Sequence, residues 1–374
     1  MKLLFWMAVL YVIAYFIQAV AKCFSRKKWT NHDLGLLVGL SLCLTFISYF
    51  VIPDETTDLW RYHAVANWYK LGKTSFYSAT VKSISASSST LYLHVLFLYI
   101  VSKLNNNSLL QVIWCSLTYG FFTATIQKFA TRFNLEMNRI YPTVFMFFGL
   151  VSYFTCVSNL RYPCLCVLFF FAAYLKLFEG KNYPLIIASI VGIGMHLSIF
   201  MMLLIWIVYL VSKKTSLYRC IVFWSLLVNL IIAVLERLPI DRLRYVGEKL
   251  YYYFNVYEEN LSMRLRLIFI SLQIAILVLM YLTKKHRWNY LDEGFKNYYK
   301  FLECLLLFAI GSIANDTMLK RTMILLGPCL IPALGMIMPV FKYKNHITNL
   351  WLIYGFGLIA LYMVSLFTFF SFAV

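Results

Sequence analysis

The sequence predicts an all-α protein, a polytopic transmembrane bundle of about 11 to 13 helices with two larger outer loops. Hydrophobic residues make up 62% of the 374 positions, charged residues only 13%, and the mean hydropathy is +0.74. This composition lies outside the usual range of soluble domains. Apolar runs of about 17 to 25 residues recur, each long enough to cross a hydrocarbon core as a helix. Backbone polar groups in lipid must pair internally, and continuous apolar helices satisfy that requirement.

The apolar runs give the expected spans in chain order. The first run is interpreted as a helix and not as a cleaved signal peptide, because it is long and lacks a clear small-residue cleavage site before Lys22. The expected spans cover about 2–21, 34–52, 89–103, 108–126, 140–157, 163–178, 183–211, 218–236, 264–282, 299–314, 322–341 and 347–370.

Basic clusters between the runs predict the orientation. The formal net charge is +19, which both cytoplasmic loops and affinity for anionic lipid explain. The longest polar connections, 54–88 and 237–262, are then outer loops of a single membrane domain that covers 1–374. Basic residues do not gather in a soluble domain, so we expect no nucleic-acid partner. The clusters that agree on an outer amino terminus lie at 22–28, 213–219, 284–287 and 342–344.

The middle of the chain departs from strict alternation. Alternation puts the basic residues of 128–139 outside, against the charge rule. The run 183–211 is too long for one crossing, since about thirty helical residues measure roughly 45 Å. We therefore expect a broken helix or hairpin at His196 and a re-entrant segment at 89–103, which together bring Arg161 and His196 to the outer face.

A segment dense in ionisable and aromatic side chains follows the second run. It contains Asp54, Asp58, Arg61 and Tyr62. Carboxylates suit sugar hydroxyls, an arginine suits a pyrophosphate, and aromatic rings suit sugar faces. An interfacial helix with an aromatic belt would have a similar composition. The segment is a candidate substrate site.

Ionisable residues also interrupt the apolar runs. Arg161 stands at a junction between two runs, where it either reaches a lipid headgroup or holds a pyrophosphate through paired hydrogen bonds. His196 and Ser198 lie inside about thirty otherwise apolar residues, and intramembrane ionisable residues are functional candidates. His196 is either a neutral residue bonded to a neighbouring helix or a base for a sugar hydroxyl.

Three further arginines are candidates for binding an anion. Arg264 and Arg266 follow the aromatic loop 241–260, which suits either sugar stacking or an amphipathic interfacial helix. Arg321 lies in a polar segment, where it either pairs with Asp316 or joins a cationic pocket for phosphate. No cluster has the spacing of metal ligands, and the nine cysteines are scattered, so we expect neither a metal nor a cofactor.

The order of these features resembles the EpsG and Wzy families of surface-polysaccharide polymerases. Those proteins show a D-x-x-x-Y motif after an early helix, matched here by Asp58 to Tyr62. An arginine that opens a helix follows, matched by Arg161, and then an H-x-S-like motif, matched by His196 to Ser198. A late arginine that begins a helix corresponds to Arg321.

Two positions depart from the EpsG pattern. Thr57 replaces the glycine that often precedes the aspartate, and Tyr162 replaces the glutamine that often follows the arginine. The resemblance is therefore to the wider polymerase group and not to EpsG specifically.

The resemblance implies a GT-C-like glycosyltransferase of the bacterial inner membrane. Such an enzyme transfers a growing glycan from undecaprenyl pyrophosphate to an incoming lipid-linked repeat unit at the outer face. Arg161, Arg264 and Arg321 would stabilise the departing pyrophosphate, and His196 or Asp58 would accept the proton of the acceptor hydroxyl. Lipid-linked repeat units, membrane lipids, a chain-length regulator and a flippase are the implied partners. Two alternatives fit some of the same residues: a membrane O-acyltransferase and a lipid-linked oligosaccharide flippase.

Overall fold

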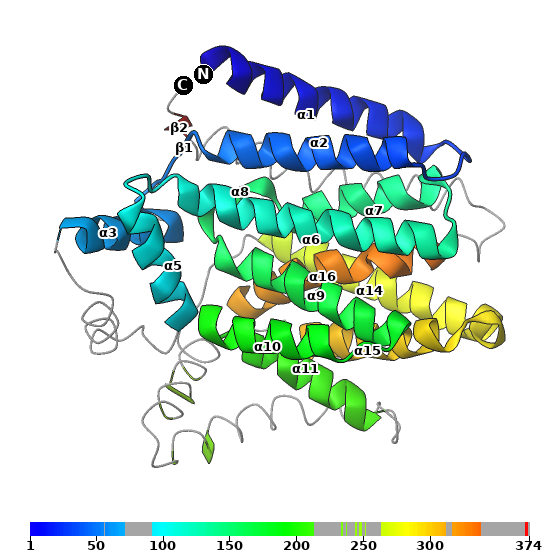
Figure 1. Ribbon diagram of the computed structural model, residues 1–374. Coiled ribbons are helices and arrows are strands. Elements are labelled where there is room, and N and C mark those ends of the chain that lie inside the picture. Colours follow the sequence, from blue (N-terminus) through cyan, green and yellow to red (C-terminus); the bar gives the residue numbers. More distant parts are fainter. Residues whose placement is uncertain are drawn as a thin grey trace. The chain divides into compact units, whose positions relative to one another are not determined.

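The computed structural model describes residues 1–55, 57–71, 92–212, 263–311 and 316–337, with 371–372 and a few positions between 233 and 251. These residues form an all-α bundle of the membrane type, as the composition predicts (Figure 1). The expected spans 218–236 and 347–370, and most of the expected outer loop 237–262, lie outside the described residues.

Five helices in the described part of the chain are long and apolar enough to cross a membrane. Large apolar side chains such as Leu10 and Ile17 project from the first of them, 63% and 67% exposed, as expected for a surface that meets lipid. The five helices are α1 (Lys2–Cys23), α2 (Asn31–Ser48), α6 (Leu109–Phe133), α9 (Arg161–Glu179) and α14 (Met263–Arg287).

The other elements are shorter or less apolar. The helices among them are α3 (Asp58–Leu71), α5 (Tyr92–Lys103), α7 (Met137–Leu150), α8 (Tyr153–Ser158), α10 (Tyr183–Met195), α11 (Ile199–Ser212), η4 (Trp288–Tyr290), α15 (Glu293–Gly311) and α16 (Asp316–Ile337). Two short strands, β1 (Val51–Ile52) and β2 (Ser371–Phe372), pair antiparallel.

Two of the expected runs are broken. The expectation of one helix over 140–157 is wrong, because the chain leaves the helix at Val151 and restarts at Tyr153. Ser152 has an extended backbone and its side chain accepts a hydrogen bond from the backbone N–H of Thr155, which caps the new helix. The expected break in 183–211 is confirmed: α10 ends at Met195, and His196 is extended.

The chain divides into two compact units, which are described separately. The first unit comprises Met1–Leu175, Asn182–His196 and Gly327–Val374, and the second comprises Lys176–Lys181 and Leu197–Leu326. In the first unit, α2 packs against α1 and α6, and α1 also packs against α7. Helix α3 packs against α5 and α8, and α5 packs against α10.

One end of the first unit gathers basic loops. Near the start of α7, the backbone N–H of Met137 donates to the carbonyl of Lys27 at 2.8 Å, and that of Trp29 donates to the carbonyl of Leu135 at 2.9 Å. The basic residues of 128–139 therefore lie beside the basic cluster 22–28, and strict alternation of the runs is wrong here. The reason is the length of α5, whose 12 residues span about 18 Å, too little to cross a membrane.

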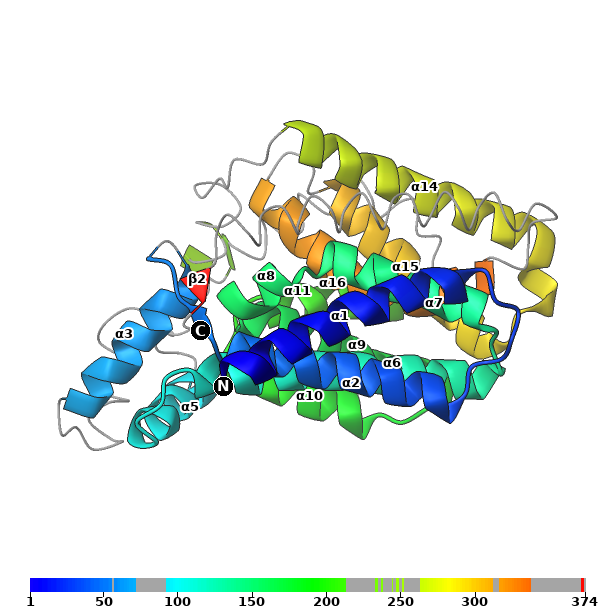
Figure 2. The same cartoon turned by 90° about the horizontal axis from the view of Figure 1, so that it is seen from above.

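The opposite end of the first unit carries α3, α5, α8 and the start of α6, as both views show (Figures 1 and 2). Asn106 donates a side-chain hydrogen bond to the hydroxyl of Tyr49 at 3.1 Å, and Gln111 donates to the carbonyl of Val51 at 3.1 Å. We call this the site end, because the candidate residues of the first unit lie here.

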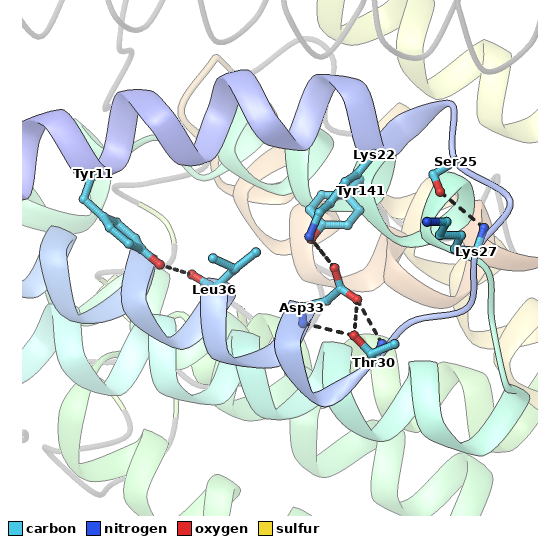
Figure 3. Close-up of polar contacts among 8 residues, drawn as sticks. All are labelled: Tyr11, Lys22, Ser25, Lys27, Thr30, Asp33, Leu36 and Tyr141. Atoms are coloured by element: carbon cyan, nitrogen blue, oxygen red, sulfur yellow. Dashed lines mark hydrogen bonds and ion pairs between the residues drawn. The ribbon is translucent and has the colours of Figure 1, made fainter.

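A buried carboxylate fastens the basic end (Figure 3). Asp33 is 0% exposed and pairs with the ammonium group of Lys22. It also accepts hydrogen bonds from the hydroxyl of Tyr141 at 3.0 Å and from the backbone and side chain of Thr30 at 3.0 and 2.7 Å. The Thr30 contacts form a capping box at the start of α2. One carboxylate thus joins α1, α2 and α7.

The second unit has an aromatic core. Helices α11 and α14 both pack against α15. The ring of Phe301 lies 5.5 Å from that of Trp206 and 5.9 Å from that of Tyr209, centroid to centroid, and all three residues are buried.

Candidate functional site

Helix α3 begins where the D-x-x-x-Y motif begins. The hydroxyl of Thr57 donates to the carbonyl of Asp54 at 2.6 Å and accepts a hydrogen bond from the backbone N–H of Trp60. Thr57 therefore caps the helix and places the Asp58 carboxylate in the first turn, where the helix dipole favours negative charge. Tyr62 follows one helical turn later on the same face.

The two motif residues Tyr62 and Arg161 are in direct contact. Both Nε and Nη2 of Arg161 donate to the Tyr62 hydroxyl, the first at 2.9 Å. The guanidinium carbon also lies 4.7 Å from the centroid of the Tyr62 ring, a cation–π distance. Tyr62 is 8% exposed, so the start of α9 is fixed against a buried residue of α3.

Arg161 makes its third contact with the end of α10. Its Nη1 donates to the backbone carbonyl of Met195 at 3.1 Å. Met195 is the last residue of α10, where backbone carbonyls have no partner within the helix and carry partial negative charge. All partners of Arg161 in the described part of the chain are thus neutral groups, and no described carboxylate forms an ion pair with it.

Asp58 also acts on the Tyr62 hydroxyl. Burial raises the pKa of Tyr62, and the charge and hydrogen bond of Asp58 act in the same direction, while Arg161 opposes them. Tyr62 is therefore a neutral phenol that links a carboxylate to a guanidinium. Asp58 also pairs with the guanidinium of Arg61 at 3.3 Å, an exposed contact that contributes little to stability.

His196 lies at the same end, just after α10. Its ring centroid is 5.5 Å from that of Tyr162, the residue after Arg161. The approach of α10 to α5 is close here, because a Cβ atom on Gly194 would lie 2.6 Å from Cγ of Leu93. Glycine at this position allows the end of α10 to reach α5 and Arg161.

His94 of α5 is a member of this cluster that the sequence interpretation missed. It is 8% exposed, and its ring packs edge-on against that of Tyr62 with centroids 4.9 Å apart. The signal was present, because His94 interrupts the apolar run 92–103 just as His196 interrupts a later run.

The histidine of α3, His63, ties this helix to the bundle. Nε2 of His63 lies 3.0 Å from Oε1 of Gln111, whose amide donates to the carbonyl of Val51. Since Gln111 uses its nitrogen on Val51, its oxygen accepts from His63. Burial lowers the pKa of His63, and the hydrogen bond to Gln111 partly offsets this effect.

The remaining predicted residues lie elsewhere. In the second unit, Nη1 of Arg321 donates to the hydroxyl of Ser198 at 3.1 Å, which brings two predicted residues together. Arg266 lies in α14 and is partly exposed, whereas the side chain of Arg264 lies outside the described residues. Asp54 is exposed and lies before α3, which begins at Asp58.

The first unit therefore brings together Asp58, Tyr62, Arg161 and His196, and adds His94. The donor set combines a guanidinium with a carboxylate and two imidazoles. Within the described ranges no group of three His, Cys, Asp or Glu residues could hold a metal ion. Compared with known proteins, the chain matches no protein-family model, no curated protein and no solved structure significantly.

Proposed function

We propose that this protein is a polysaccharide polymerase of the bacterial inner membrane. It transfers a glycan from undecaprenyl pyrophosphate to a lipid-linked repeat unit at the outer face, in the synthesis of an O-antigen, capsule or exopolysaccharide. The proposal includes a GT-C-like architecture with about 11 to 13 membrane helices, counted from the apolar runs of the whole sequence.

The observation that carries the proposal is the contact between Arg161 and Tyr62. Two short motifs that are 99 positions apart meet through two hydrogen bonds. The guanidinium is oriented by neutral acceptors and has no ion pair within the described residues, so its charge remains available to an anion. A guanidinium held in this way suits a pyrophosphate, which it binds through paired, charge-assisted hydrogen bonds.

The reaction requires a cation and a base. The acceptor hydroxyl oxygen forms a bond to the anomeric carbon, and the bond from that carbon to the pyrophosphate oxygen breaks. Negative charge grows on the departing pyrophosphate, where Arg161 stabilises it. The hydroxyl proton passes to His196 or Asp58, which lie at the same end of the first unit as Arg161.

The experiment compares surface glycans in a strain that lacks the gene and carries each variant. Arg161→Ala and His196→Ala should leave the protein in the membrane at normal abundance and leave cells with single-repeat glycan. Removal of one charge-stabilising donor typically costs about 10²- to 10³-fold in rate. Arg132→Ala and His32→Ala are matched controls, because both side chains are exposed and lie on α6 and α2.

The outcome also separates the alternative classes. Long-chain glycan in both site variants would overturn the polymerase proposal. Repeat units trapped on the cytoplasmic leaflet would indicate a flippase. Unchanged chain length with loss of an acyl group would indicate an O-acyltransferase.

A further inference from the structure

Helices α1 and α2 of the first unit leave an open groove between them, with a volume of about 480 Å³. The hydroxyl of Tyr11 donates to the backbone carbonyl of Leu36 at 3.1 Å, so this ring bridges the two helices (Figure 3). Gly39 gives the ring room, because a Cβ atom there would clash with the Tyr11 hydroxyl. The residues that line the groove are Tyr11, Ala14, Tyr15, Ile17, Gln18 and Leu36.

The groove has the polarity and the length of an acyl-chain site. Most of its lining is apolar, and Ile17 projects from α1 with 67% of its surface exposed. Helix α1 is long and apolar enough to cross a membrane, so its exposed face meets lipid. The stretch from Tyr11 to Lys22 rises about 16 Å along the helix axis, close to half of a hydrocarbon core about 30 Å thick. One acyl chain of one leaflet therefore matches the groove in length.

The polar side chains of α1 mark one end of the groove. Gln18 and Lys22 follow Tyr15 at spacings of three and four residues, which places all three on one side of the helix. The exposed amide of Gln18 lies about 6 Å before Lys22 along the axis, and the headgroup layer of a bilayer is about 5–7 Å thick on each side. At this depth the amide can donate to the ester oxygens of a phospholipid.

The loop after α1 presents positive charge beyond this end. Nε1 of Trp29 donates to Oε1 of Gln127 at 3.0 Å, which adds to the backbone hydrogen bonds that hold the loop against the start of α7. The nearby carboxylate of Asp33 is buried and paired with Lys22, so it does not neutralise the loop. Fixed, exposed cations at a membrane surface attract anionic headgroups. The exposed cations of the loop are Arg26, Lys27 and Lys28.

We propose that the groove and the loop together bind one anionic phospholipid. Its acyl chain lies in the groove, its ester oxygens lie at Gln18, and its phosphate lies on the cations of 26–28. The groove by itself would accept the chain of any phospholipid, and the loop by itself would attract any anionic surface. Together, on one helix and within the length of one lipid, they select a chain and a charge at once. This site is separate from the proposed glycan transfer and does not depend on it.

The test labels the bound lipid in place. The full-length protein is reconstituted in phosphatidylcholine vesicles that contain a trace of one of two photoactivatable lipids, phosphatidylglycerol or phosphatidylcholine, with identical diazirine-bearing acyl chains. Mass spectrometry then maps the cross-linked residues. We expect labelling within 11–18 and at Leu36, and about 10-fold more from the phosphatidylglycerol probe, because each basic residue near a membrane surface favours an anionic lipid about 5-fold.

Two variants separate the headgroup contact from the chain contact. Lys27→Gln/Lys28→Gln should lower groove labelling by the phosphatidylglycerol probe at least about 5-fold and leave labelling by the phosphatidylcholine probe unchanged. Lys284→Gln/Lys285→Gln changes another adjacent pair of exposed lysines and should alter neither.

Ala14→Trp fills the groove from an exposed position and should suppress labelling by both probes. Its control is Leu3→Trp, at a 73% exposed position of α1 that does not line the groove.

Three results would overturn the proposal. Equal labelling by the two probes in the parent protein would show an unselective lipid surface. A preference for phosphatidylglycerol that persists in Lys27→Gln/Lys28→Gln would remove the loop from the site. Cross-links between two copies of the chain at the groove residues, in place of lipid labelling, would identify a protein interface. The lysine variants keep the test valid should Ala14→Trp fail to accumulate.

Discussion

The guanidinium of Arg161 donates two hydrogen bonds to the hydroxyl of Tyr62, which is buried in a helix that starts 103 positions before α9. This contact joins the first unit's most polar helix to the start of an apolar one. It also orients the guanidinium, whose partners in the described part of the chain are all uncharged.

Tyr62→Phe should lower the polymerisation rate without unfolding the protein. The change removes the acceptor of two Arg161 N–H groups but keeps the ring 4.7 Å from the guanidinium. A charge displaced by about 1 Å can cost about 10²-fold in rate, so we expect shorter glycan chains at normal protein abundance. The glycan ladder is the measurement, and Tyr183→Phe, with its 61% exposed ring, is the control. A ladder of parental length would contradict the positioning role of Tyr62.

Gly194→Ala should destabilise the contact between α10 and α5. The added Cβ would meet Cγ of Leu93 at 2.6 Å, and forced overpacking typically costs about 1–3 kcal/mol. The shift also moves the carbonyl of Met195 away from Arg161, so activity should fall with stability. Thermal unfolding and glycan length measure the two effects.

The control and the rescue for this variant come from the same chain. Gly35→Ala introduces a methyl group into open space on α2, and should be neutral or slightly stabilising. Adding Leu93→Ala to Gly194→Ala should restore the close approach and part of the activity. A Gly194→Ala protein as stable as the Gly35→Ala protein would show that this contact yields easily.

Asp33→Ala should be among the most destabilising single changes at the basic end. It leaves the Lys22 ammonium without its carboxylate and removes the acceptor of Tyr141 and Thr30. Breaking a buried ion pair by removing one partner costs about 3–5 kcal/mol. Glu293→Ala removes the 80% exposed partner of Lys296 and should cost under about 1 kcal/mol. Equal melting temperatures of the two variants would contradict the fastening role of Asp33.

Acidification should weaken the attachment of α3. Burial lowers the pKa of His63 below 6.5, so the unfolded chain binds this proton more readily than the folded protein does. The stability that depends on neutral His63 is complete above pH 6.5 and is lost as the pH falls below that value. Melting temperatures measured between about pH 8 and pH 5 should therefore fall less in His63→Gln than in the parent protein. His32→Gln, on an exposed position, should keep the parental pH dependence.

The fold class could be predicted from the sequence because an apolar composition and long apolar runs are what a lipid environment requires of a helical protein. The start of α3 was also readable: Thr57 and Asp58 form a helix-start signal inside what was expected to be an outer loop. The break at Val151 could not be predicted, because apolar residues flank it and the capping residue Ser152 alone is a weak signal.

The contacts within the site were harder to predict from the sequence than the residues that form it. The motifs predict Asp58, Tyr62, Arg161 and His196 as members of the site, but their meeting depends on contacts between α3, α9 and α10 that no motif contains. His94 was overlooked because no motif contains it, although its position in an apolar run gave the same signal as His196. Strict alternation of inner and outer loops is wrong because α5 resembles a membrane span in the sequence but is too short to be one.

The capping of α10 by Arg161 constrains the length of a segment more than its composition. Each residue turns an α-helix by about 100°, so one inserted or deleted residue between Tyr183 and Met195 would swing the last carbonyl to another side of the helix axis. Among homologous chains, we expect the apolar side chains of this segment to exchange freely, while gaps in their alignment fall outside it. The length of α10, more than its composition, then decides whether its last carbonyl meets Arg161.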